Sequence, residues 1–104
     1  MDMMKVLQQA QQMQGKMQQV QEELARMTVT GSAGGGMVTV EADGRGQMRG
    51  VRIDPSVVNR DDIEMLEDLV LVAVTDAQAK AAKLAQDEMG KIAGGLNLPF
   101  KLPF

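Results

Sequence analysis

The sequence predicts an α+β fold in which a helix, a three-stranded antiparallel sheet and a second long helix follow one another along 104 residues. Three observations predict it. Apolar residues recur every three or four positions over residues 3–27, β-branched residues alternate over residues 28–53, and helical spacing returns from residue 61 to about 92. A chain of this length makes one small domain. We therefore expect residues 1–95 to form a single α-β-β-β-α domain and residues 96–104 to form a tail containing Pro and Phe.

The first predicted helix covers residues 3–27, which are rich in Gln and Met and contain a single glycine, Gly15. Its apolar residues are spaced by about 3.5 positions, the period of a heptad seam. They are Met3, Leu7, Ala10, Met13, Met17, Val20, Leu24 and Met27. At 1.5 Å per residue the helix is a rod of roughly 37 Å. Such a rod is long for a domain of this size, so we expect part of it to project or to meet a partner copy.

Three short strands are predicted in the middle of the chain. β-Branched residues mark them at Val29, within residues 37–40, and at Val51 and Ile53. Two glycine-containing segments, residues 34–36 and 43–46, lie between them and predict tight turns. Pro55 ends the third strand, because proline cannot donate to a sheet and holds the preceding Asp54 extended.

The second predicted helix covers residues 61 to about 92, with Asn59 or Asp61 as its N-cap. Acidic residues crowd its first turns, where the helix dipole favours negative charge. One apolar stripe runs along it, formed by Ile63, Leu66, Val70, Ala73, Ala77, Ala81 and Leu84. Residues 69–74 are apolar on nearly every side and by themselves suit a buried strand, but the Ala-rich continuation favours a helix. We expect such a helix to be covered on more than one side.

The missing residue types exclude most catalytic chemistry. The chain has no His, Cys, Trp or Tyr and only two Phe, so the usual nucleophiles, the neutral-pH general base and common zinc ligands are absent. We expect neither an enzyme nor a cofactor nor a small-molecule substrate. The Gly-rich residues 31–36 lack the Lys-Ser/Thr end of a phosphate-binding loop, and the acids of residues 61–68 lack the spacing of a calcium loop. We therefore expect a hairpin turn and a helix start, and no metal site.

No part of the sequence predicts a membrane partner. The longest apolar run, residues 69–74, is far shorter than the ~20 residues of a membrane span. The first residues are acidic and then Gln-rich, unlike the basic and then apolar start of a signal peptide. These observations predict a cytoplasmic protein.

Basic residues gather locally although the formal net charge is −3. Residues 44–60 hold four Arg against one Asp, and a local positive potential can bind nucleic acid even in an acidic chain. Lys5 and Lys16 share one face of the first predicted helix, near a row of Gln. The candidate DNA-binding residues are therefore Lys5, Lys16, Arg45, Arg49 and Arg52. The alternative is ordinary solvated charge, which is favoured for Lys80 and Lys83 because each has an acid four residues away.

The two apolar helix faces predict a homodimer, because one copy has no aromatic core residue and buries too little of them. The candidate interface residues are Met13, Met17, Val20, Leu24, Leu69, Val70 and Val72. A Met-lined groove for other partners is the alternative.

Several short sequence blocks, spread in order over nearly the whole chain, match the pattern of one protein family. They are residues 8–14, 16–18 and 21–24, Val29-Thr30-Gly31, residues 36–40, and Leu98-Pro99 with a terminal Pro103-Phe104. The most specific are Val51-Arg52-Ile53-Asp54-Pro55-Ser56 and Glu64-Met65-Leu66-Glu67-Asp68-Leu69-Val70. On these blocks the sequence resembles the YbaB/EbfC family of bacterial nucleoid-associated proteins.

The resemblance implies that this α+β fold forms a tight, intertwined homodimer with projecting helices like tweezers. It further implies a cytoplasmic protein that is located on the nucleoid, binds double-stranded DNA with little sequence preference, organises the nucleoid and influences gene expression. It assigns no individual DNA-binding residue, so the candidates above rest on charge alone. The alternative from another functional class is a protein–protein adaptor or chaperone-like helper that uses the Met-rich helix and the apolar tail.

Overall fold

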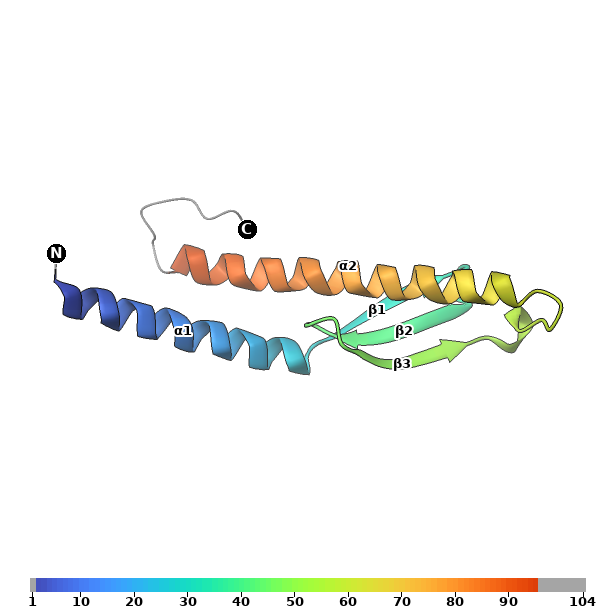
Figure 1. Ribbon diagram of the computed structural model, residues 1–104, viewed down its shortest axis with the longest axis horizontal. Helices are drawn as coiled ribbons and strands as arrows, with labels where there is room; N and C mark the ends of the chain where they lie inside the picture. The colour runs from blue at the N-terminus through green and yellow to red at the C-terminus, as the bar shows by residue number, and fades with distance from the viewer. Residues whose placement is uncertain (1, 96–104) are drawn as a thin grey trace.

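A computed structural model describes residues 2–95 of the chain and confirms the predicted order of elements (Figure 1). The elements are α1 (Met3–Arg26), β1 (Thr28–Ala33), β2 (Val38–Asp43), β3 (Met48–Ile53), a short 3₁₀ helix η1 (Pro55–Val57) and α2 (Ile63–Gly95). The molecule is elongated, with principal extents of 69 × 22 × 16 Å. The predicted tail, residues 96–104, lies outside the described residues.

The three strands form one antiparallel sheet in the order β1-β2-β3, and α2 packs on one face of it. Val38 and Val40 of β2 are buried against Ala73 and Ala77 of α2. The residues at this contact are small, so the helix lies close to the sheet. The approach is closest at Gly31, where an added Cβ would overlap the backbone of α2. Only glycine fits this position.

The long second helix begins two residues later than the sequence predicts. Asp62 supplies its N-terminal cap, because its carboxylate accepts a hydrogen bond from the backbone N–H of Met65 at 3.2 Å. Asn59, one of the two predicted caps, instead accepts from the N–H of Asp61 at 3.0 Å. That bond belongs to the turn before the helix. Of the predicted stripe, Ala73, Ala77 and Ala81 are buried, Leu66, Val70 and Leu84 are half-buried, and Ile63 in the first turn is 46% exposed.

Side chains of α2 cap the outer edge of β1. The carboxylate of Asp76 accepts from the backbone N–H of Ser32 at 3.0 Å, and the ammonium of Lys80 donates to the carbonyl of Thr30 at 2.9 Å. Asp76 and Lys80 also form the predicted i,i+4 ion pair, at 3.3 Å. These bonds occupy main-chain groups that an edge strand otherwise offers to another strand.

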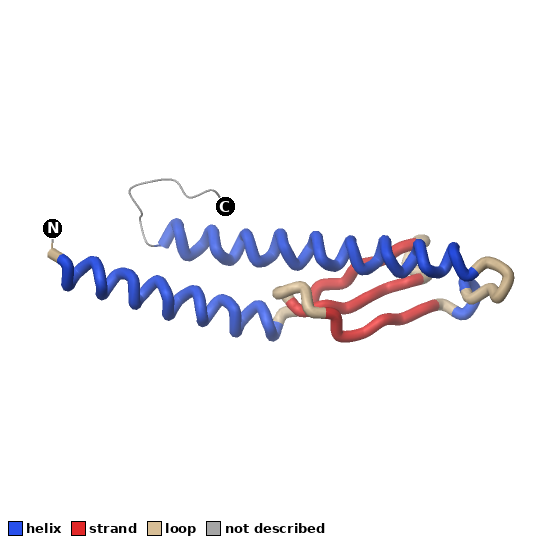
Figure 2. Tube along the Cα trace, viewed as in Figure 1, coloured by secondary structure: helices blue, strands red, loops and turns tan. Residues whose placement is uncertain are grey.

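The first helix, α1, projects beyond the sheet and lies along the C-terminal half of α2 (Figure 2). Val20 and Leu24, near the end of α1, are buried, whereas residues 2–12 are all exposed. Leu24 lies against the β2–β3 turn, where a Cβ added at Gly44 would come within 2.8 Å of the Leu24 carbonyl oxygen. This projecting helix, called the arm below, is therefore attached to the rest of the chain mainly through its last two turns.

Candidate nucleic-acid interface

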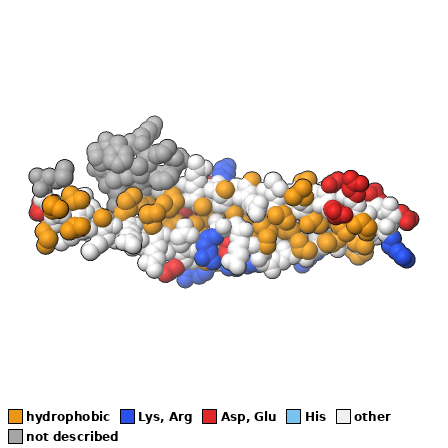
Figure 3. Space-filling model, in the orientation of Figure 1, with side chains coloured by type: hydrophobic (Ala, Val, Ile, Leu, Met, Phe, Trp, Pro, Cys, Tyr) orange, Lys and Arg blue, Asp and Glu red, His pale blue; other side chains and the backbone are white. Residues whose placement is uncertain are grey.

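The five predicted DNA-binding residues lie in three places. Lys5 and Lys16 are on the projecting arm α1. Arg45 lies in the β2–β3 turn and Arg49 at the start of β3, both at the base of that arm, and Arg52 is farther along β3. The structure thus brings Arg45 and Arg49 together and leaves the other three apart. Figure 3 shows basic side chains near the middle of the molecule, and acidic ones gathered, together with a basic group, at the end that holds the start of α2.

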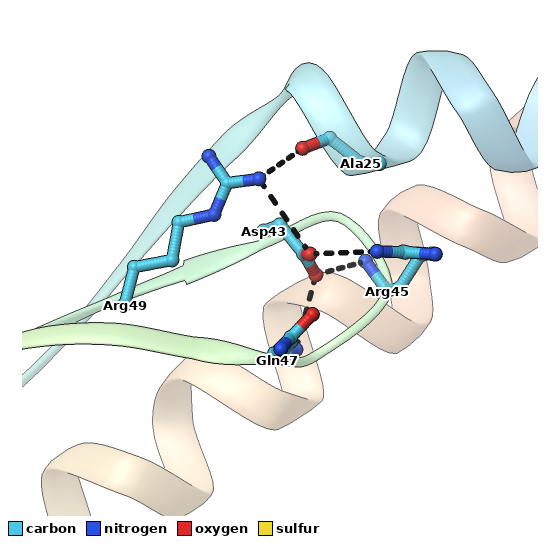
Figure 4. A network of polar contacts seen from close by, with 5 residues as sticks. All are labelled: Ala25, Asp43, Arg45, Gln47 and Arg49. Atoms are coloured by element: carbon cyan, nitrogen blue, oxygen red, sulfur yellow. Dashed lines mark hydrogen bonds and ion pairs between the residues drawn. The ribbon is translucent and has the colours of Figure 1, made fainter.

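Asp43 organises the β2–β3 turn. One carboxylate oxygen, Oδ1, accepts hydrogen bonds from the backbone N–H groups of Arg45 at 2.8 Å and Gln47 at 3.0 Å (Figure 4). Gly46 has a φ of 89°, in the region that favours glycine, and this completes the turn. The side chain of Asp43 is fully buried. The predicted turn residue is therefore also a buried charge at the root of the arm.

The second carboxylate oxygen of Asp43, Oδ2, faces both arginines. Guanidinium nitrogens of Arg45 and Arg49 lie 3.6 Å and 3.7 Å from it, and the two arginine side chains remain 45% and 47% exposed. Arg49 also donates a hydrogen bond to the carbonyl of Ala25 in the last turn of α1. Asp43 thus offsets one of the two positive charges that the sequence presents here as a local excess.

The environment of Asp43 favours its ionised form. Burial raises the pKa of this carboxyl, but the N–H donors of Gln47 and Arg45 and the charges of Arg45 and Arg49 outweigh that effect. The pKa therefore lies below its ordinary value. At neutral pH the carboxylate and the two guanidinium groups form a charged cluster.

Lys5 and Lys16 stand exposed on α1, about 16 Å apart along the helix. Arg52 is exposed and directly opposite Thr39, beside a shallow groove of about 320 Å³ that Thr30, Thr39, Glu41 and Gly50 help to line. Within residues 2–95, these three cations make no ion pair within 4.0 Å. They are the predicted candidates whose charge is free for an anionic partner.

The predicted dimer-interface residues differ in how far a single chain buries them. Val20 and Leu24 are buried within one chain, at 7% and 0% exposure, because they pack where α1 meets the sheet and α2. Met13, Leu69 and Val70 are half-buried. Met17 and Val72 are 41% and 55% exposed, so they remain available to a partner copy.

The sequence interpretation missed the role of Asp43 as the partner of two arginines. Its position inside the Asp43-Gly44-Arg45-Gly46 turn was the available signal, since an Asp before such a turn commonly accepts from the backbone that follows. The contact between Arg49 and Ala25 left no signal, because the two residues are far apart in sequence.

The described part of the chain also bears on metals and membranes. Among residues 2–95 no three acidic side chains come together as metal ligands. Within the same residues, neither helix is long and apolar enough to cross a bilayer.

Comparison with known proteins gives consistent matches over most or all of the chain. A protein-family model described as the YbaB/EbfC DNA-binding family matches residues 1–96. A nucleoid-associated protein of Gemmatimonas aurantiaca is 54% identical over 104 residues, covering 100% of both chains. Nucleoid-associated protein DP1429 of Desulfotalea psychrophila is 48% identical over 99 residues, covering 95% of this chain and 93% of the relative. Among solved structures, the uncharacterized protein HP0035 from Helicobacter pylori shares the fold, with a TM-score of 0.72, 24% identity and coverage of 92% of this chain and 97% of that one.

Proposed function

The chain belongs to the YbaB/EbfC DNA-binding family, a family of nucleoid-associated and non-enzymatic proteins, and from this premise we propose how it binds. It binds double-stranded DNA as a homodimer, with little sequence preference, and so organises the nucleoid in the cytoplasm and influences gene expression. The observation that carries this proposal is the free charge of Lys5 and Lys16 on a projecting helical arm, together with Arg52 on β3.

The geometry of α1 suits the backbone of a duplex. Its 24 residues span about 36 Å, close to the ~34–36 Å of one turn of B-DNA. Lys5 and Lys16 lie on one face, and the neighbouring Gln side chains can also donate to phosphate oxygens. Contacts of this kind position a protein on DNA without reading its sequence. Loose sequence preference follows from that chemistry.

A second copy is proposed to cover apolar side chains that β3, α2 and α1 leave exposed. Val51 of β3 stands opposite the buried Val40, so both point to the helix-covered face of the sheet. Because α2 packs on β1 and β2, Val51 is left 56% exposed, while Leu71 and Val72 of α2 are 65% and 55% exposed. A two-fold dimer would bury the same apolar surface on both copies and place two α1 arms in one particle. Met17 of α1, 41% exposed, is a further apolar side chain open to a partner copy.

Binding to random-sequence duplexes at low and moderate salt tests the proposal. Six cations (Lys5, Lys16 and Arg52 from two copies) would give a slope near −5 in log affinity against log salt, at about 0.9 per phosphate contact. A fourfold rise in salt would then weaken binding by roughly three decades. Replacing all three by Gln should weaken binding to every duplex alike and flatten the slope.

The matched control is Lys83→Gln, which removes one exposed charge from α2 and should leave binding unchanged. Lys80 is a poorer control because it also bonds to the carbonyl of Thr30. If the parent chain binds no duplex at low salt, the DNA-binding proposal is wrong and the adaptor hypothesis replaces it.

A further inference from the structure

The last turn of α1 is held by groups that come from the β2–β3 hairpin. Helix C-termini leave carbonyl groups without intrahelical partners. The Leu24 carbonyl accepts from the backbone N–H of Gly44 at 2.8 Å as well as from Met27 at 3.1 Å. The Ala25 carbonyl accepts from the guanidinium of Arg49. A cation at this end of a helix is also favoured by the helix dipole.

Arg49 bridges two parts of the chain. One of its guanidinium nitrogens lies 3.7 Å from the Asp43 carboxylate and also donates to the Ala25 carbonyl (Figure 4). Asp43 is itself fixed, since it is buried and accepts two hydrogen bonds from the turn that it begins. The bridge therefore ties the end of the arm to a rigid point at the end of the central strand, β2.

We propose that Arg49 is a positioning residue, which fixes the direction of α1 relative to the sheet. It acts in duplex binding through the placement of Lys5 and Lys16 and makes no phosphate contact of its own. This second statement rests on the proposed function, whereas the first concerns the chain alone. Asp43 is the anchor of the same device.

The length of the arm makes its direction sensitive to the bridge. Lys5 lies 20 residues before Ala25, which is about 30 Å along the helix axis. A tilt of about 10° at the base would move Lys5 by roughly 5 Å, well beyond the reach of one hydrogen bond. Apart from this base, the arm has little to hold it, since residues 2–12 are exposed. A small change of helix direction at Arg49 therefore becomes a large displacement of Lys5.

The first experiment measures the arm directly and needs no DNA. The chain has no Cys, so the changes Gln11→Cys and Glu41→Cys place one spin label on α1 and one on β2. Labelled chain is diluted with unlabelled chain, and the distance between the labels is measured by pulsed electron resonance. Arg49→Gln should broaden the distance distribution. Arg52→Gln, which removes a charge from the same strand without touching α1, should leave the distribution narrow.

The second experiment compares salt slopes for duplex binding. Arg49→Gln should lower affinity about tenfold and leave the slope unchanged, because no phosphate contact is lost. Lys16→Gln should flatten the slope by about 0.9 per contact, or about 1.8 for a dimer. Arg49→Lys keeps the positive charge. We expect its affinity for the duplex to fall only if its distance distribution also broadens. Circular dichroism tests whether each variant is folded. If Arg49→Gln does not fold, Arg49→Lys is compared with the parent chain in its place.

Each outcome decides the inference. A narrow distribution in Arg49→Gln overturns the positioning role, whatever the affinity. Restored affinity in Arg49→Lys with a broad distribution shows a charge contact and also overturns it. A parent chain that binds no duplex refutes the proposed function and the part of the inference that depends on it, while the distance measurement still decides whether Arg49 fixes the arm.

Discussion

Val40 and Val51 stand directly opposite each other on β2 and β3, yet Val40 is 1% exposed and Val51 is 56% exposed. The two side chains share one face of the sheet. The difference arises because α2 covers β1 and β2 and stops short of β3. One apolar face is thus only partly covered by the chain itself. The uncovered part at Val51 is the strongest structural argument for a partner copy.

Aspartate substitutions at Val51 or Val72 should disrupt the dimer and leave the single chain folded. Both side chains are more than half exposed in one copy, so a charge there costs little until a partner buries it. An unpaired buried charge should weaken association by about 3 kcal/mol or more, over a hundredfold in dissociation constant. Sedimentation equilibrium of parent and variants measures this. A parent chain that is a stable folded monomer at micromolar concentration would exclude the dimer.

The sequence predicts the elements well because each has a strong local signal. The heptad spacing of α1, the alternating strands and the glycine-containing turns all depend on neighbouring residues. The start of α2 was misplaced because several acids near residue 61 can cap a helix, and only the fold selects Asp62. Helix ends are commonly uncertain by a residue or two for this reason.

The candidate site was less predictable, because charge excess in a sequence says nothing of partners in space. Arg45, Arg49 and Arg52 look alike in one stretch. In the structure Asp43 pairs with Arg45 and Arg49. Arg52, opposite Thr39, makes no ion pair among residues 2–95. Val20 and Leu24 belong to the same seam as Met17, but only the seam's end is covered by the chain.

Replacing Gly31 by Ala should strongly destabilise the fold. An added Cβ would overlap the backbone of Ala73 and Ala77 and lie 2.8 Å from the Ala77 Cβ. Since neither helix nor strand can shift without opening the core, we expect a loss of about 3 kcal/mol or more in the free energy of unfolding. Urea denaturation followed by circular dichroism measures it.

Gly50→Ala is the matched control, because it adds the same methyl group to β3 where no atom lies within 4 Å. Its effect should stay within about 1 kcal/mol of the parent. Equal losses for the two variants would show that α2 does not approach the sheet at Gly31 as described.

Duplex DNA should bind at least as tightly as a single strand of equal length. Single-strand binders stack bases on aromatic side chains, and residues 2–95 contain none. Fluorescence anisotropy with labelled duplex and single strand makes the comparison. Both Phe residues of the chain lie in the tail at Phe100 and Phe104. If single strands bind more tightly and truncation after Gly95 removes that preference, the tail is a stacking element and the prediction is wrong.

Acid should destabilise the chain through Asp43. Its pKa in the folded state lies below the ordinary value of 3.8, which it regains on unfolding. The ionised carboxylate therefore stabilises the fold fully above about pH 3.8, and this stabilisation is lost as the pH falls through the lower, folded-state pKa. Arg45 and Arg49 are the cationic side chains that face this carboxylate. Asp43→Asn keeps the size of the side chain and an oxygen that can accept from the turn, but removes the titrating group. The variant should be less stable than the parent at pH 7, and its stability should fall less between pH 5 and pH 2, as measured by thermal melts.

Asp54 and Asp76 also have lowered pKa values and remain in both proteins, so the comparison isolates Asp43. Parallel pH profiles for the two proteins would show that the Asp43 carboxylate does not stabilise the turn in its ionised form.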